Sequence, residues 1–107
     1  MLPAETVFKM ATMGGAEALG LSDSIGSLEP GKLADVVLID IDRPELTPMY
    51  NAFSHLVYAI KAAHVDTVIV NGRVVVRGRA LLTVDTDEVL RMARSLKDRV
   101  LRSLEAP

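Results

Sequence analysis

Apolar residues recur with helical spacing at both ends of the chain, and the segment between them carries short apolar runs of strand length. Near the end, the apolar positions are Val89, Met92, Ala93, Leu96, Val100 and Leu104. Their 3.6-residue period predicts an amphipathic helix over residues 86–104. Asp85 is placed to cap that helix, with Glu88 three positions later as in a capping box.

A second helix is expected at the start of the chain, over residues 3–20. Pro3 suits a first helical turn, where its missing N–H costs no hydrogen bond, and Gly20 suits the position just after a helix. The pair Gly14-Gly15 lies inside this segment. Because glycine within a helix costs about 1 kcal/mol relative to alanine, the pair predicts a kink or a close approach of another backbone.

Between the helices, the pattern predicts strands over residues 34–41, 67–70, 73–76 and 80–83, and a short helix over residues 52–61. Asn71-Gly72 separates the second and third strands, and this dipeptide is a strong signal for a two-residue hairpin turn. Gly78 predicts a bulge or bend before the last strand. These elements indicate an α+β fold.

The turn before the first strand is the most specific local feature. Pro30 sets φ at the second turn position, and Gly31 tolerates the positive φ that a type II turn needs at the third. The run Val36–Ile39 has no polar alternation, so we expect both of its faces to be covered. Asp35 begins this run, and we expect its carboxylate to accept hydrogen bonds from the turn at residues 29–32.

The charges of the last helix are arranged to stabilise it. Acidic residues lie at its start and basic residues toward its end, which complements the helix dipole. Asp87–Arg91 and Asp98–Arg102 have the i,i+4 spacing of helical ion pairs. We interpret the charged side as a solvent-facing surface.

Composition limits the classes of protein to which the chain can belong. It has 107 residues, half of them hydrophobic, with a formal net charge of −2 and no cysteine. A nucleic-acid surface needs clustered Lys and Arg, so no nucleic-acid partner is expected. No apolar run approaches the roughly 18 residues of a membrane span. Without cysteine there are no disulfides or thiolate metal sites, and we expect a single domain in the cytoplasm.

Few side chains offer catalytic or metal-binding chemistry. The only histidines, His55 and His64, lie nine positions apart, which matches neither a helical metal site nor a closely spaced loop pair. Packed or surface histidines are the simpler interpretation. Asp40 and Asp42 lack the supporting ligands of a calcium loop, no serine stands in a Gly-x-Ser-x-Gly context, and the glycines match no phosphate loop. We assign no catalytic, cofactor-binding or metal-binding residue.

Five stretches resemble one enzyme family in order and spacing. They are Met10–Gly20, Ile25–Asp40, Leu46–Asn51, Ser54–Ala59 and Val65–Arg73. Together they resemble the C-terminal part of metal-dependent amidohydrolases of the deaminase and chlorohydrolase type. The third and fourth stretches look most like methylthioadenosine/S-adenosylhomocysteine deaminases and s-triazine hydrolases. The resemblance covers roughly residues 3–104.

The resemblance implies a small, incomplete β-sandwich-type domain with flanking helices, which is the composite domain of such enzymes. It makes residues 1–20 the last barrel helix, 21–85 the β-rich composite domain and 86–107 a C-terminal amphipathic helix. The residues to which we assign structural roles are Pro30, Gly31, Asp35, Asn71 and Gly72. His55 and Tyr58 lie where the resemblance places a contact with the barrel or a neighbouring subunit, so an interface role is expected for them.

The resemblance also implies the function of a longer protein. Members of the family hydrolyse non-peptide C–N bonds of purine- or triazine-like rings, with a zinc or iron ion held by a barrel. The family's metal motifs, a His-x-His pair followed by further histidines and carboxylates, are not present in these residues. A (β/α)8 barrel alone needs about 250 residues, so the catalytic barrel is absent. We expect this chain to be structural and non-catalytic.

Two alternatives stay open. One is a stand-alone β-module for oligomerisation or partner binding. The other is the tail of a hydantoinase- or dihydroorotase-type amidohydrolase, which also begins with a Gly-x-x-Ala-Asp turn. The uncharged strands at Val36–Ile39 and Val74–Val76 would present apolar edges without the rest of an enzyme. We therefore expect a homo-oligomer of the isolated chain, and the missing barrel as its partner in a complete enzyme.

Overall fold

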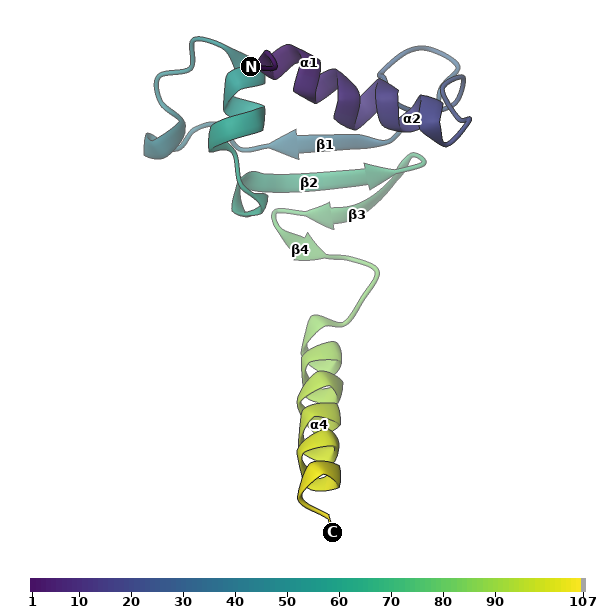
Figure 1. The fold of residues 1–107 in the computed structure, drawn as a ribbon, viewed down its shortest axis with the longest axis vertical. Helices are drawn as coiled ribbons and strands as arrows, with labels where there is room; N and C mark the ends of the chain where they lie inside the picture. Colours follow the sequence, from purple (N-terminus) through teal and green to yellow (C-terminus); the bar gives the residue numbers. More distant parts are fainter. Residues whose placement is uncertain (107) are drawn as a thin grey trace.

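A single four-stranded antiparallel sheet forms the centre of the structure, with helical segments before and after it (Figure 1). The computed structural model describes residues 1–106. The strands are β1 (Val36–Ile39), β2 (Val65–Val70), β3 (Arg73–Arg77) and β4 (Ala80–Leu81), in that order across the sheet. The α+β class is therefore confirmed. The described residues form one open sheet, so the expected sandwich stays a prediction.

The strand limits differ from the expected ones at all four strands, and most at β1. The strand expected over residues 34–41 is shorter and spans only Val36–Ile39, because Ala34 and Asp35 are used to hold the neighbouring hairpin. β2 begins two residues earlier than expected, and β4 ends after two residues. β1 pairs with β2 in antiparallel register, with Val36 opposite Ile69.

The N-terminal helical segment is continuous but changes its winding. α1 (Ala4–Lys9) leads into a π-helical stretch, η1 (Met10–Gly14), and then into α2 (Gly15–Ala18). The wider turn therefore lies where the Gly14-Gly15 pair predicted an irregularity. Within residues 1–106, every atom found within 4 Å of a Cβ added at either glycine belongs to the preceding helical turn.

The end of this helix is the one that Gly20 predicted. Gly20 has φ +71°, and its N–H donates to the carbonyl of Glu17 over 3.0 Å. The N–H of Leu21 reaches back to the carbonyl of Ala16 over 2.8 Å. This pair of bonds is a Schellman motif, which stops the helix and satisfies its last carbonyls.

Four short helical segments lie between β1 and β2. They are η2 (Pro44–Leu46), α3 (Ala52–Ser54), η3 (His55–Ala59) and η4 (Ala62–His64). The helix expected over residues 52–61 is confirmed but ends at Ala59; its cap is the Asn51 side chain, which accepts from the N–H of Ser54 over 3.0 Å. The rings of Phe8 and Phe53 lie 5.4 Å apart and join α1 to α3.

Two tight turns connect the last three strands. Asn71 and Gly72 have φ values of 47° and 77°, which is the left-handed pair of a type I′ hairpin turn, as predicted. Gly78 and Arg79 have φ values of 55° and 68° and link β3 to β4. The bend expected at Gly78 is thus a second two-residue hairpin turn, and the positive φ of Arg79 was not foreseen.

The last helix, α4, spans Thr86–Glu105, and Asp85 caps it by accepting from the N–H of Glu88 over 3.1 Å. The predicted helix is confirmed, but its two ion pairs are wrong. The Nε atoms of Arg91 and Arg102 donate instead to the backbone carbonyls of Asp87 and Asp98. An exposed ion pair is worth little free energy, so a nearby carbonyl competes with it. No helix among residues 1–106 is long and apolar enough to span a bilayer.

The core is small for a chain in which half the residues are hydrophobic. Only Ala16, Leu46, His64 and Thr67 are buried among the described residues. The radius of gyration is 18.9 Å, whereas a compact domain of about 100 residues has about 13 Å. The excess arises because α4 projects away from the sheet (Figure 1). Much apolar surface is therefore left uncovered.

The expectation that both faces of β1 are covered is wrong for these residues. Val37 and Leu38 are each about half exposed. β1 lies at the edge of the sheet and pairs only with β2. The apolar run is thus built for burial, but residues 1–106 do not supply the covering surface.

Candidate functional site

The turn at residues 29–32 has the predicted geometry. Gly31 has φ +93°, and the N–H of Lys32 donates to the carbonyl of Glu29 over 3.1 Å. The largely buried Lys32 ammonium donates to the Ser27 hydroxyl over 2.8 Å and pairs with the Glu29 carboxylate at 3.2 Å. The hydrogen bond from Ser27, followed by the Lys32 contacts, lowers the pKa of Glu29. The turn is closed by these local contacts.

Asp35 has a different partner from the expected one. Its Oδ1 accepts from the backbone N–H of Asn71 over 2.7 Å, and it does not bind the turn at residues 29–32. The N–H of Gly72 donates to the carbonyl of Ala34 over 2.9 Å. Both bonds lie at the tip of the β2–β3 hairpin. The entry to β1 is therefore tied to the hairpin turn, so Asp35, Asn71 and Gly72 form one structural unit.

The close backbone approach occurs at Gly26 and not at the helical glycine pair. A Cβ built on Gly26 would lie 2.8 Å from the Cβ of Ala16 and 2.9 Å from the Sδ of Met13. Gly26 also has φ +97°. The loop after α2 can lie against this helix only because residue 26 has no side chain.

His64 is a buried side chain with both ring nitrogens in use. Its Nδ1 accepts from the N–H of Lys61 over 2.9 Å, and its Nε2 lies 2.8 Å from a carboxylate oxygen of Glu45. A nitrogen that accepts an N–H carries no proton, so the ring is neutral and Nε2 donates to Glu45. This hydrogen bond is the main reason that the pKa of Glu45 is lowered. The pair joins η2 to the start of β2.

His55 is turned toward its own chain. Its Nε2 donates to the carbonyl of Leu46 over 3.0 Å, and its Nδ1 lies 3.2 Å from the carbonyl of Asn51. The ring is half-buried, and it holds the loop that contains the cis Thr47-Pro48 bond. Tyr58, from the same short helix, is 68% exposed. Of the two residues, Tyr58 has the free surface that an interface needs, and the interface role stays a prediction for both.

The described residues do not fit the metal that the family resemblance implies. Within residues 1–106, no three side chains of His, Cys, Asp or Glu are grouped so as to hold an ion. His64 and His55 use their ring nitrogens in the contacts above. The Asp40 carboxylate binds the N–H of Asp42 and the Nε of Arg43, the latter over 2.9 Å. His55, His64 and Asp40 thus each have a partner within the chain.

One opening in the described structure is an apolar cavity of about 890 Å3. It lies between the N-terminal helical segment, β1 and the α3–η3 segment, and its lining includes Phe8, Met13, Leu19, Val36, Phe53 and Leu56. A space with these walls accommodates apolar side chains better than a polar ligand.

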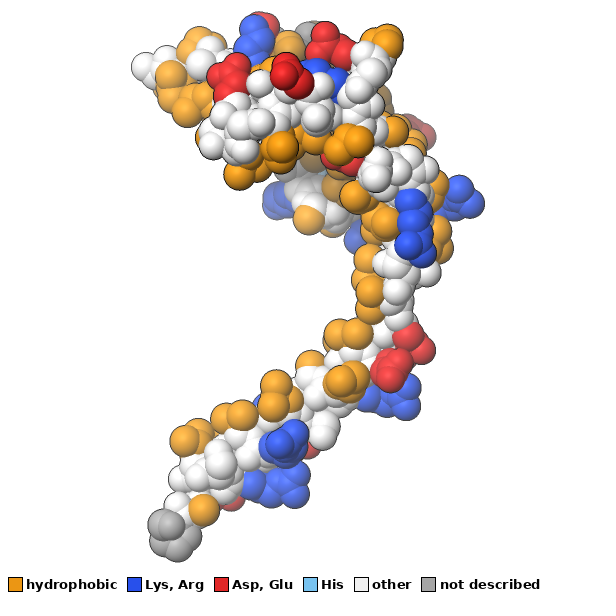
Figure 2. Space-filling view, turned by 90° about the vertical axis from the view of Figure 1, so that its right-hand side faces the viewer, with side chains coloured by type: hydrophobic (Ala, Val, Ile, Leu, Met, Phe, Trp, Pro, Cys, Tyr) orange, Lys and Arg blue, Asp and Glu red, His pale blue; other side chains and the backbone are white. Residues whose placement is uncertain are grey.

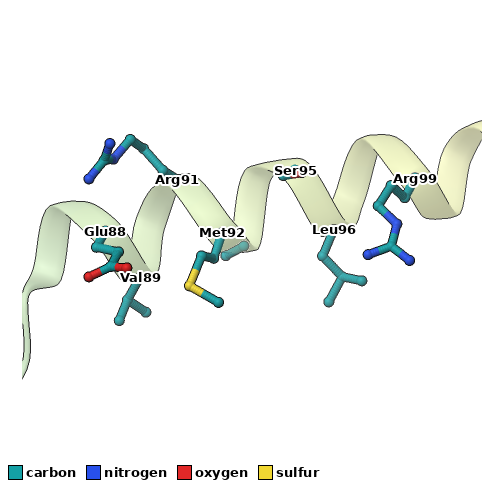
Figure 3. Close-up of a pocket in the computed structure, with 8 residues that line it drawn as sticks. Glu88, Val89, Arg91, Met92, Ser95, Leu96 and Arg99 are labelled. Carbon is teal, nitrogen blue, oxygen red and sulfur yellow. The ribbon is translucent and has the colours of Figure 1, made fainter.

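A second apolar surface runs along α4. Figure 3 shows Val89, Met92 and Leu96 pointing to the same side of the helix, with Arg91 on another side. All the residues that line this hollow come from one helix, so it is an open face and not a closed pocket. We call the exposed residues Val89, Met92, Leu96, Val100 and Leu104 the apolar stripe.

Sequence reasoning missed two features of this region. The contact between Glu45 and His64 spans 19 positions, and that between Asp35 and Asn71 spans 36. Neither pair has a sequence motif. His64 lies three positions before the strand predicted at residues 67–70, and only its burial, which no pattern indicated, would have shown that it needs partners.

Comparison with known proteins gives close relatives over the whole chain. The chain is 47% identical over 107 residues to 5-methylthioadenosine/S-adenosylhomocysteine deaminase 1 of Syntrophus aciditrophicus. The alignment covers 100% of this chain and 24% of that protein. It is 54% identical over 104 residues to 5-methylthioadenosine/S-adenosylhomocysteine deaminase of Desulforudis audaxviator, again covering 24% of the relative. The chain thus spans about a quarter of the length of the curated relatives it matches.

Solved structures agree with these relatives. A zinc-bound adenosine deaminase from Xanthomonas campestris superposes with a TM-score of 0.90 at 39% identity, covering 94% of this chain and 23% of that one. The zinc complex of atrazine chlorohydrolase TrzN from Arthrobacter aurescens superposes with a TM-score of 0.80 at 28% identity, covering 89% and 21%.

The family assignment has support from the sequence as well as from the fold. The amidohydrolase family matches residues 1–75, which is more than half of the chain. The relatives are named as deaminases, and the structural neighbours include a deaminase and a chlorohydrolase. The resemblance noted in the sequence is therefore confirmed, and the chain belongs to the amidohydrolase family.

Proposed function

We propose that this chain is the C-terminal, non-catalytic part of a metal-dependent deaminase that acts on an adenosine-type ring. The main support is the 47% identity to a 5-methylthioadenosine/S-adenosylhomocysteine deaminase over all 107 residues. Hydrolytic deamination replaces the ring amino group with a carbonyl oxygen, consumes water and releases ammonia. Residues outside this chain would carry out that step.

The metal of such an enzyme, zinc or iron, would also be bound outside this chain. The described residues hold no suitable ligand set, and each histidine already has a hydrogen-bond partner. We propose that residues 1–20 form the last barrel helix and that the sheet belongs to the composite β-domain. The role of the chain is then to complete that domain and support the barrel.

A hybrid enzyme tests this function. The matching segment of the Syntrophus aciditrophicus deaminase is replaced by this chain, and ammonia release from 5-methylthioadenosine is measured. We expect the turnover of the hybrid to stay within about tenfold of the parent's. A factor of ten corresponds to a change of about 1.4 kcal/mol in the activation barrier. A soluble, folded hybrid without turnover would contradict the proposal.

The stand-alone module is the alternative that one observation favours. Val37 and Leu38 on the edge strand β1 are half exposed, which suits pairing with another chain. The intact mass of the natural protein separates the two functions. A mass near 11.6 kDa would favour the module, and a mass several times larger would favour the enzyme.

A further inference from the structure

The apolar stripe of α4 is an unpartnered surface in this structure. No residue of the helix is buried, and Met92, Leu96 and Leu104 are more than half exposed. The opposite side carries charged residues such as Arg94 and Asp98. A helix with one apolar side and one charged side is built to pack on another body along the apolar side.

The direction of the stripe shows where that body must lie. Figure 2 shows the chain as an open curve, with hydrophobic side chains of α4 along the inner side of the curve and Lys and Arg on its outer side. Hydrophobic side chains also line the part of the upper body that faces the same hollow (Figure 2). One body in this hollow would therefore cover both surfaces.

The projecting position of α4 is also found in a much longer protein. The superposition on the Xanthomonas campestris deaminase covers 94% of this chain with a TM-score of 0.90. The part left out is shorter than the 20-residue α4, so most of the helix is included. This chain covers only 23% of that protein. The open shape is therefore compatible with a large additional body of the same polypeptide.

We infer that the apolar stripe of α4 docks on the remaining, larger part of a deaminase-type polypeptide and holds the β-domain against it. This inference rests on the proposed function and adds the surface through which the two parts bind. Leu96 is at the centre of the stripe and should be buried in the complex. Arg94 lies on the opposite side and should stay exposed.

The experiment compares one pair of variants in two proteins, the hybrid enzyme described above and the 107-residue chain. Leu96→Glu places a charge in the stripe, and Arg94→Gln makes the same change in net charge on the opposite side. We expect Leu96→Glu to lower the melting temperature of the hybrid by at least about 3 °C, with Arg94→Gln within error of the parent. In the 107-residue chain both variants should melt like the parent, because Leu96 is not buried there.

If Leu96→Glu prevents the hybrid from folding, Leu96→Ala replaces it in the test. The smaller substitution should still lower the melting temperature of the hybrid, but by less than a buried charge would. If all variants of the hybrid melt at the same temperature, the inference is overturned. It is also overturned if the hybrid without any substitution cannot fold. A dimer of the 107-residue chain that Leu96→Glu dissociates would identify a second copy as the occupant, and would also overturn it.

The docking of α4 and the turnover of the hybrid are tested separately. A hybrid that turns over substrate but is insensitive at Leu96 would contradict only the docking surface. A hybrid that is destabilised by Leu96→Glu but has no turnover would contradict only the proposed function.

Discussion

The carboxylate of Asp35 accepts a 2.7 Å hydrogen bond from the backbone N–H of Asn71, across 36 positions of sequence. Asn71 needs a positive φ for its hairpin turn, and its N–H points out of the hairpin toward the entry of β1. The Ala34 carbonyl accepts from Gly72 beside it. The entry to β1 and the turn after β2 are thus fixed to each other.

Asp35→Ala should destabilise the fold and have no other effect. The bond is charge-assisted but exposed, so we expect a loss of about 1 kcal/mol in the free energy of unfolding. Chemical denaturation measures it. Asp35→Asn keeps an acceptor oxygen at the same place and should lose less, whereas an Asp35→Ala variant as stable as the parent would show that the bond contributes nothing.

Gly26→Ala and Gly31→Ala form a matched pair. Both glycines have positive φ, but an added Cβ meets Ala16 and Met13 at residue 26 and nothing within 4 Å at residue 31. Gly31→Ala should cost only the left-handed backbone strain, about 1–2 kcal/mol. Gly26→Ala should cost about 1–3 kcal/mol more, because the loop must move away from the helix. Equal losses would contradict the close packing at Gly26.

His64→Leu should destabilise the loop before β2. The substitution leaves the part-buried Lys61 N–H without its acceptor, at a cost of about 1–3 kcal/mol. The Glu45 carboxylate is more than half exposed and is hydrated instead. Thermal unfolding and hydrogen exchange at residues 61–65 measure the effect. Lys61→Ala is the control, because it keeps the backbone N–H that His64 accepts. A destabilisation as large in the control would show that the histidine is not the source.

Acid should weaken the fold through Glu29 and Glu45. Hydrogen bonds from Ser27 and from His64, respectively, lower the pKa of each carboxyl below its ordinary value of 4.5. The unfolded chain therefore takes up protons first as pH falls. The stability that each group contributes is present above pH 4.5 and is lost as pH falls through its lowered folded-state pKa.

The measurement is the melting temperature between neutral pH and pH 3, where the lower limit lies about 1.5 units below the ordinary glutamate pKa. Glu45→Gln should make the fall with acidification shallower, and so should Glu29→Gln. Glu17→Gln is the control, since Glu17 has no hydrogen bond or ion pair of its side chain within the described residues. A curve for Glu45→Gln parallel to that of the parent would contradict the prediction.

The 107-residue chain should neither bind zinc tightly nor release ammonia from adenosine-type substrates. The reason is that the described residues offer no three-ligand group and that His55 and His64 are engaged. Metal content after dialysis against added zinc, and ammonia release with 5-methylthioadenosine, check both statements. One tightly bound zinc per chain with enzyme-like turnover would contradict them.

Features determined by a few adjacent residues could be predicted from the sequence. Gly20, Asn71-Gly72 and Asp85 act on their own neighbourhood, so the helix end, the hairpin turn and the helix cap were all predicted correctly. Arg79 was missed because a positive φ is unfavourable for its side chain. The short β3–β4 connection imposes that φ, and no local preference indicates it.

Contacts between distant residues could not be predicted in the same way. Asp35 was assigned to the nearest turn, but the sheet brings the tip of the β2–β3 hairpin closer to it. The partner of His64 depends on the path of residues 40–46, which no pattern specifies. The covering of β1 was mispredicted because its apolar run indicates burial without saying which segment supplies the cover.

The order of the strands has a consequence for the rate at which the sheet assembles. β2 and β3 are joined by two residues, so this hairpin closes almost no loop and should form in microseconds. β1 can pair with β2 only after the 25 residues between Ile39 and Val65 have closed into a loop. Closing that longer loop costs chain entropy before any pairing compensates for it. The hairpin should therefore be the nucleus, with the capture of Ala34 and Asp35 by its turn as the late step that commits β1 to its register.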